Sequence, residues 1–243
     1  MKYAVSDIHG NKEAWDEILS LINFSKDDDL YVLGDVIDRN PYGIEILQQI
    51  IRTPNMHMLL GNHEYMMLDA LGMPWHNENS QVEAKSYIWM DRNGGRITWD
   101  AFVKLQDEEK KEILDFLSNL PLNIEVEVNN KKFLLCHAVP EFVYDMMATM
   151  GPVGEDKGSF CVWERDAIKF FMADGIYDGT IIFGHTPTVN LGANEDKPEM
   201  LKFINGSAVS HDIDCGAAYP NHPSFKGRLS CLCLDTLEEF YSK

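Results

Sequence analysis

The chain has 243 residues, of which 45% are hydrophobic and 11% aromatic, enough for one large globular domain or two small ones. Lys and Arg number 21 against 39 Asp and Glu, which gives a formal net charge of −18 at pH 7. A surface this acidic repels nucleic-acid backbones and anionic lipids, so we expect neither nucleic acid nor a membrane as a partner. We expect a single domain over residues 1–243.

The first residues and the cysteines indicate a cytoplasmic protein. No basic-then-apolar segment resembles a signal peptide, and no apolar stretch approaches the roughly twenty residues that span a bilayer. The five Cys residues are an odd number without the paired spacing of a disulfide or zinc framework. Cys231 and Cys233 alternate along an expected strand, so we interpret them as small hydrophobes on one face.

The first seventy residues repeat one pattern three times: a short apolar strand, a polar loop and a helix. Leu30 to Leu33 is a continuous apolar run, typical of a strand that is buried on both faces. Three such units in succession predict a parallel sheet with right-handed crossovers. The expected strands are residues 2–6, 30–33 and 57–60, and the helices after them end near residues 23, 53 and 71.

The pattern changes after Gly72. Residues 72–118 predict a helical excursion beside the site, in which Trp75, Trp89 and Trp99 are interpreted as packing anchors rather than substrate platforms. Residues 122–136 predict a β-hairpin that opens a second sheet. Beyond it we expect a loop over 141–160, a helix over 163–171, and strands over 180–183, 200–204, 211–214 and 228–234.

Polar clusters follow five of the expected strands. Ligands of α/β sheets bind at the carboxyl ends of strands, which is where these clusters lie. Four of the eight His residues occupy such ends; any single one could be a structural, hydrogen-bonded His, but the ordered set predicts a site. The clusters contain Asp7 and His9; Asp35, Asp38 and Arg39; Asn62 and His63; His137; and His185.

These residue types favour two-metal hydrolysis, in which one carboxylate bridges two ions. Asp35 is the natural bridging candidate. Mixed imidazole, carboxylate and amide donors suit Mn²⁺, iron or Zn²⁺, and argue against a Cys-rich zinc site or an all-oxygen calcium site. Around Asp35, one ion would be flanked by Asp7 and His9 and the other by Asn62, His137 and His185.

In order and spacing, these motifs resemble those of the calcineurin-like metallophosphoesterases. The resemblance covers nearly the whole chain, and is strongest to the lambda-phage type of serine/threonine phosphoprotein phosphatase. It implies an α/β fold in which two mixed β-sheets pack as a sandwich with helices on the outer faces. The matching stretches are residues 7–10, 34–39, 61–67, 93–95, 162–165, 184–186 and 213–216, together with His137.

The resemblance also implies roles for individual residues. His63 would be the general acid that protonates the leaving alkoxide, and Asp38 would orient it by a hydrogen bond. Arg39 and Arg165, with Asn62, would bind the phosphoryl group. The implied cofactors are two metal ions, Mn²⁺ first with iron or Zn²⁺ as alternatives. Asp7, His9 and Asp35 would hold one ion, and Asp35, Asn62, His137 and His185 the other.

The implied activity is hydrolysis of phosphoserine and phosphothreonine monoesters in a phosphorylated protein or peptide by a metal-bridging hydroxide. The alternative is a symmetrical diadenosine tetraphosphate hydrolase, which shares the site. That group usually has Asp after Gly-Asn-His and often lacks the acid's Asp partner, so Glu64 and Asp38 favour the phosphatase. A third hypothesis is an inactive scaffold, which would have no need to keep both His63 and Asp38.

The chain departs from the family pattern at Ser6, Asn40 and Ala138-Val139, where Gly is common. None of these departures removes an expected ligand. Residues 141–160 and 188–209 indicate no particular substrate, and the sequence leaves the physiological substrate, the native metal pair and the oligomeric state open.

Overall fold

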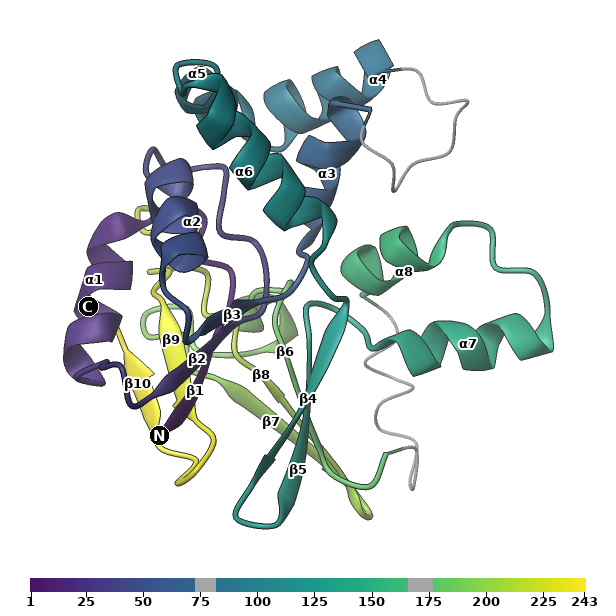
Figure 1. Ribbon diagram of the computed structural model, residues 1–243. Coiled ribbons are helices and arrows are strands. Elements are labelled where there is room, and N and C mark those ends of the chain that lie inside the picture. The colour runs from purple at the N-terminus through teal and green to yellow at the C-terminus, as the bar shows by residue number, and fades with distance from the viewer. Residues whose placement is uncertain (73–81, 166–176) are drawn as a thin grey trace.

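The computed structural model describes residues 1–72, 82–165 and 177–243. Within these residues the chain forms two mixed five-stranded β-sheets that face one another, with helices on the outside (Figure 1). The strand orders are β10-β9-β1-β2-β3 and β4-β5-β6-β8-β7. The expected α/β sandwich is therefore confirmed.

The first sheet is built on the parallel strands β1 (Lys2–Val5), β2 (Asp29–Val32) and β3 (Met56–Met58). Val5 pairs with Val32 and Val32 with Met58, so the three strands end at the same edge. This register confirms the predicted parallel sheet. The antiparallel strands β9 (Ser230–Cys233) and β10 (Glu239–Tyr241) complete it, the second of which the sequence pattern did not predict.

The second sheet starts with the predicted hairpin of β4 (Asn123–Val128) and β5 (Lys131–Cys136). Asn129 and Asn130 form the turn with φ of 51° and 60°, a left-handed conformation that Asn tolerates well. Strands β6 (Thr180–Phe183) and β8 (Ala208–Asp212) continue parallel to β5, and β7 (Leu201–Asn205) pairs antiparallel with β8. The carboxyl ends of β5 and β6 therefore lie at one edge.

The core has two layers because both faces of the first sheet are buried. Ala4, Tyr31 and Leu33 pack between the sheets with Leu135 and Ile182. The alternate residues of β1 and β2 belong to the second layer, beneath the helices. Burial on both faces explains why residues 30–33 are continuously apolar.

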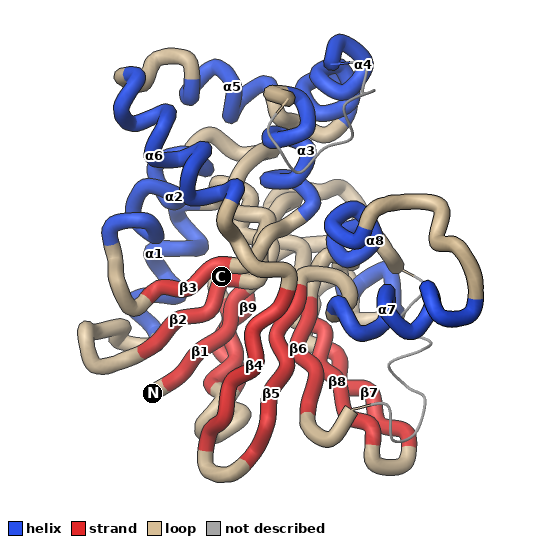
Figure 2. The backbone as a smooth tube through the Cα atoms, turned by 45° about the vertical axis from the view of Figure 1, so that its right-hand side comes forward, coloured by secondary structure: helices blue, strands red, loops and turns tan. Residues whose placement is uncertain are grey.

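Two groups of helices cover the first sheet and its carboxyl edge. The helices α1 (Lys12–Leu21) and α2 (Gly43–Arg52) lie on its outer face, whereas a helical group stands over the strand ends (Figures 1 and 2). Residues 82–118 of the predicted excursion are largely helical, and Trp75 lies outside the described residues. The second group comprises α3 (Asn62–Ala70), α4 (Val82–Tyr87), the π-helix η1 (Ile88–Arg92), α5 (Arg96–Phe102) and α6 (Asp107–Ser118).

The loop predicted over 141–160 is wrong. This stretch contains α7 (Glu141–Met150) and α8 (Lys157–Trp163). Asp156 caps α8 by accepting the backbone N–H of Ser159, which offsets the low helix propensity of Gly158. Trp163 ends this helix rather than starting one, and residues 166–171 of the expected helix lie outside the described residues. In 188–209, η2 (Thr188–Leu191) is a short 3₁₀ helix before β7.

The cysteines confirm the interpretation made from their spacing. All five are free thiols and all are buried. Cys231 and Cys233 both lie in the core layer beneath the helices, as two apolar side chains on one strand face. Among the described helices, none has the length and apolar character needed to cross a bilayer.

Candidate active site

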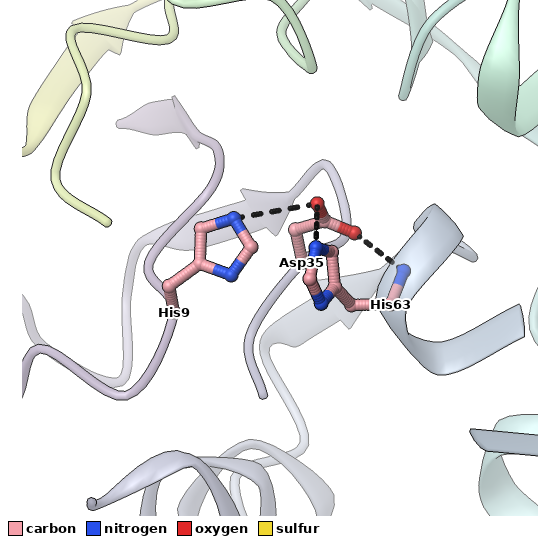
Figure 3. A group of neighbouring side chains, drawn as sticks. All are labelled: His9, Asp35 and His63. Atoms are coloured by element: carbon pink, nitrogen blue, oxygen red, sulfur yellow. Dashed lines mark hydrogen bonds and ion pairs between the residues drawn. The ribbon is translucent and has the colours of Figure 1, made fainter. Parts of the chain in front are cut away.

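The strand ends bring Asp7, His9 and Asp35 together. His9 Nε2 lies 3.4 Å from Asp35 Oδ2 and 3.9 Å from Asp7 Oδ1, and all three side chains are buried. In Figure 3 the imidazoles of His9 and His63 approach the same carboxylate of Asp35. The structure thus places the three expected ligands of the first ion around one point.

Asp35 also faces a second group, made of Asn62, His137 and His185. His137 Nε2 is 3.5 Å from Asp35 Oδ1. Asn62 Oδ1 is 2.9 Å from His137 Nε2 and 2.8 Å from His185 Nδ1. The two oxygens of Asp35 therefore point to two different clusters, as a bridging carboxylate would.

The buried imidazoles are oriented by backbone carbonyls. His9 Nδ1 lies 3.0 Å from Ile37 O, His137 Nδ1 2.7 Å from Leu33 O, and His185 Nε2 3.3 Å from Trp163 O. A ring nitrogen that faces a carbonyl must carry the proton, so the other nitrogen of each ring presents a lone pair to the clusters. Burial lowers the pKa of all three rings and keeps them in the neutral form that binds metals.

This donor set fits cations. The lone pairs of His137 and His185 converge on the oxygen of Asn62, an arrangement of acceptors that a positive ion would satisfy. Burial, and after it the charges of Asp7 and Glu64, raises the pKa of Asp35 well above its ordinary value. A cation at this carboxylate would reverse that shift. Nitrogen and oxygen donors without sulfur match Mn²⁺, iron or Zn²⁺.

His63 and Asp38 form a buried pair beside the two Asp35 clusters. One cluster contains Asp7 and His9, and the other contains Asn62, His137 and His185. His63 Nδ1 is 2.6 Å from Asp38 Oδ2, and His63 Nε2 accepts from Arg39 Nη2 at 3.0 Å. Burial raises the pKa of Asp38 to about 7. Burial, and then the charge of Arg39, lowers the pKa of His63. The two residues expected to act as the general acid and its partner are therefore in contact, and the guanidinium of Arg39 covers His63 Nε2.

Arg165 contacts the loop that carries His185. Its Nη1 donates to the backbone oxygen of His185 at 3.1 Å and to Thr186 Oγ1 at 2.7 Å. Arg39 and Arg165 both line a cavity of about 540 Å³ in which no lining residue is acidic. In a chain with a net charge of −18, the two guanidiniums make the lining of this cavity locally positive.

Sequence reasoning missed the contribution of Glu64 to the geometry. Its buried carboxylate accepts the backbone N–H groups of Asp35, Val36 and Ile37 at 2.8, 2.9 and 3.2 Å. These bonds hold the loop that carries Asp35. Glu64 was noted only for its place in the Gly-Asn-His-Glu motif, and nothing in the motif shows that its side chain reaches back to the loop after β2.

The sequence pattern also did not predict the aromatic wall of the cavity. Tyr219, His222 and Phe225 contact one another with ring centroids 4.5 to 6.1 Å apart. The guanidinium carbon of Arg39 lies 4.8 Å from the centroid of the Tyr219 ring, a cation–π contact. Aromatic residues at three-residue spacing in this Pro-rich stretch were the available signal.

Comparison with known proteins gives the family. A family model described as calcineurin-like phosphoesterase matches residues 3–189, which is most of the chain. The chain belongs to the calcineurin-like phosphoesterases. The predicted resemblance is therefore confirmed. Two groups of described residues that share Asp35 could hold metal ions: one is His9, Asp35 and His63, and the other is Asp35, His137 and His185.

The relatives of this phosphoesterase include proteins with two different functional names. Serine/threonine-protein phosphatase 2 of Salmonella typhimurium is 32% identical over 189 residues, covering 75% of this chain and 78% of the relative. A symmetrical bis(5'-nucleosyl)-tetraphosphatase of Legionella pneumophila is 35% identical over 85 residues, covering 33% and 31%. A solved metallophosphoesterase from Sphaerobacter thermophilus has a TM-score of 0.53 at 19% identity, covering 99% and 86%, which supports the fold.

Proposed function

We propose that this phosphoesterase is a metal-dependent phosphomonoesterase that hydrolyses phosphoserine and phosphothreonine in proteins or peptides. The 2.6 Å contact between His63 Nδ1 and Asp38 Oδ2, beside the two clusters that share Asp35, carries the proposal. A serine alkoxide is a poor leaving group and needs a proton, whereas a phosphate leaving group does not. A buried His–carboxylate pair is the device that supplies this proton.

Two cations held by the Asp35 clusters would polarise the phosphoryl oxygens and activate the attacking water. Asp7, His9 and Asp35 are the proposed ligands of one ion. Asp35, Asn62, His137 and His185 are the proposed ligands of the other. Mn²⁺ is our first choice for the pair, with iron or Zn²⁺ as alternatives.

The two guanidiniums bind and orient the phosphoryl group. Arg39 must leave His63 Nε2 for a phosphoryl oxygen, because that nitrogen has to carry the transferred proton. Burial, and after it the charge of Arg39, lowers the pKa of His63. A phosphoryl oxygen that takes the guanidinium away from Nε2 frees this nitrogen for a proton. Arg165, which lines the same cavity, makes the second contact.

A second candidate function is hydrolysis of a symmetrical dinucleoside tetraphosphate. The aromatic wall of Tyr219, His222 and Phe225 favours it, because aromatic rings beside a guanidinium can stack on a nucleobase. A relative with the corresponding name supports the same alternative. The His63–Asp38 pair is why we rank the phosphomonoesterase first.

One comparison of substrates tests the proposal. The protein is loaded with Mn²⁺, and kcat/KM on a phosphoserine peptide is compared with that on diadenosine tetraphosphate. We expect kcat/KM to be at least about tenfold higher on the peptide, which corresponds to about 1.4 kcal/mol of additional transition-state binding. A faster reaction with the dinucleotide would replace the first candidate by the second. Turnover of neither substrate would reject both.

The variant His63→Asn tests the role of the acid. The loss of kcat on the phosphoserine peptide should be about 100-fold or more, the usual contribution of general acid catalysis. On an aryl phosphate the loss should be much smaller, because a phenolate leaves without a proton. Equal losses on both substrates would contradict the acid role.

A further inference from the structure

The carboxylate of Asp38 has a second donor besides His63. Trp89 Nε1 donates to Asp38 Oδ2 at 2.8 Å, the same oxygen that His63 Nδ1 contacts at 2.6 Å. All three side chains are fully buried. A carboxylate with one donor can rotate about its Cβ–Cγ bond, whereas two donors on one oxygen fix the plane in which His63 must lie.

The same helical segment holds the backbone of Asp38 and Arg39. The N–H of Asp38 donates to Thr98 Oγ1 at 2.9 Å, and the N–H of Arg39 donates to Gly94 O at 3.2 Å. Both residues have left-handed φ, 71° and 70°, which costs about 1 kcal/mol or more for residues with a Cβ. Contacts from η1, the turn after it and α5 thus hold a strained pair in place.

Trp89 is seated for this contact by its own local structure. It lies in the π-helix η1, and π-helical turns shift the direction of one side chain relative to an α-helix. Gly95 makes room for the indole, since a Cβ at that position would lie 2.3 Å from Trp89 Nε1. The backbone N–H of Gly95 also donates to Trp89 O at 3.0 Å. The π-helical turn, the missing Cβ of Gly95 and the hydrogen bond from Gly95 therefore all help to place the indole N–H of Trp89.

We infer that Trp89 is a positioning residue for the general acid: its indole N–H fixes the Asp38 carboxylate against His63, so the helical excursion is part of the catalytic apparatus. The inference rests on the proposed phosphomonoesterase function. It corrects the interpretation of Trp89 as a packing anchor alone. A packing role needs only the ring, whereas positioning needs the N–H.

The test is Trp89→Phe, which keeps an aromatic ring and removes the N–H. The control is Trp99→Phe, in α5, where the partly buried side chain packs against the core and Phe102. For each protein, loaded with Mn²⁺, kcat and KM are measured on a phosphoserine peptide and on p-nitrophenyl phosphate. The two leaving groups differ in their need for a proton, so their ratio reports on the acid.

For Trp89→Phe we expect kcat on the peptide to fall about 10- to 100-fold, part of the total contribution of general acid catalysis. Activity on p-nitrophenyl phosphate should stay within about threefold of the wild type, and KM should change little for either substrate. Trp99→Phe should leave the ratio of the two activities unchanged. Equal losses on both substrates for Trp89→Phe would show a merely structural role and overturn the inference.

A double-mutant cycle separates positioning from packing more sharply. In an Asp38→Ala background the oxygen that Trp89 would contact is gone, so adding Trp89→Phe should change the peptide-to-aryl ratio no further. Additive losses would overturn the inference. If Trp89→Phe does not fold, Gly95→Ala takes its place, because the new Cβ displaces the indole while Trp89 remains. The same selective loss is then expected, and a ratio equal to the wild type would refute it.

The design distinguishes this inference from the function on which it rests. If wild-type protein hydrolyses neither the peptide nor the aryl phosphate, the proposed function fails. If the wild type hydrolyses both and Trp89→Phe loses both equally, the function stands and the role of Trp89 fails.

Discussion

Gly61 is a position where a single added methyl group should disturb the site directly. A Cβ there would lie 2.3 Å from both the backbone nitrogen and the Oδ1 atom of Asp35, and 2.6 Å from Glu64 Oε2. Its φ of −98° is ordinary, so Gly61→Ala introduces no backbone strain of its own. The effect of the substitution is therefore a steric push on the proposed bridging carboxylate.

The size of the push follows from these contacts. An ordinary contact of a Cβ begins near 3.4 Å, so the Asp35 loop or α3 must move by about 1 Å. Neither can move freely, because three backbone N–H groups of the loop bond to Glu64. Overpacking of this kind costs about 1–3 kcal/mol. A misplacement of about 1 Å at reacting groups can cost on the order of 100-fold in rate.

The assays are Mn²⁺ titration by calorimetry, kcat on p-nitrophenyl phosphate and thermal unfolding. We expect Gly61→Ala to bind Mn²⁺ at least about tenfold more weakly and to lose about 100-fold in kcat. The unfolding midpoint should fall by roughly 2–12 °C, since 1 kcal/mol shifts a chain of this size by about 2–4 °C. Gly154→Ala is the matched control, because a Cβ at that position meets nothing within 4 Å. Wild-type metal affinity in Gly61→Ala would refute the reasoning.

Two further predictions concern metal ions and pH. Removing metal with EDTA should abolish phosphatase activity and lower the unfolding midpoint, because Asp35 and Asp7 then lie buried without a cation. Restoring Mn²⁺ at about 100 times its Kd should return about 2.7 kcal/mol of free energy of unfolding. A midpoint unaffected by EDTA would contradict the metal assignment. Burial, and then the charge of Lys202, lowers the pKa of His211 to about 4. Between about pH 6.5 and pH 4, His211 is therefore protonated in the unfolded chain and largely neutral in the folded chain. The contribution of His211 to the free energy of unfolding should therefore fall by roughly 1–3 kcal/mol as the pH drops through that range. When stability is measured by urea denaturation at each pH, His211→Phe should lose less stability than the wild type between about pH 6.5 and pH 4, and an equal loss in both proteins would reject the assignment to His211.

The expected ligands could be found from the sequence because each follows an apolar strand. Asp7, Asp35 and His137 follow the last residues of β1, β2 and β5 by two, three and one residues, and parallel strands of one sheet deliver their carboxyl ends to one edge. Sequence order and this rule of sheet geometry bring Asp7 to Asp35 within the first sheet. His137 and His185 follow strands of the second sheet, so their approach to Asp35 depends on how the two sheets pack, which no local pattern encodes.

The supports of the site could not be found in this way. Glu64 reaches back 29 residues to the Asp35 N–H, and Trp89 reaches 51 residues to Asp38. No local pattern encodes these distances, because they depend on how the helical group packs over the strand ends. The helix α7 was missed for a different reason: its Met- and Gly-rich neighbourhood suggested a loop, although Phe142, Val143 and Met147 follow helical spacing and pack on the core.

The backbone at the site explains why these supports matter. Asp7, His9, Asp35 and His185 all have left-handed φ, between 49° and 70°, a conformation that residues with a Cβ seldom adopt. The loops hold one another there: the N–H of His9 donates to Asp35 O at 2.9 Å, and the N–H of His185 donates to Asp7 Oδ2 at the same distance. Each ligand is therefore kept in a costly conformation by a bond to another ligand's loop. A change in one loop should spread to both clusters, which is why the damage from a methyl group at Gly61 should not stay local to Asp35.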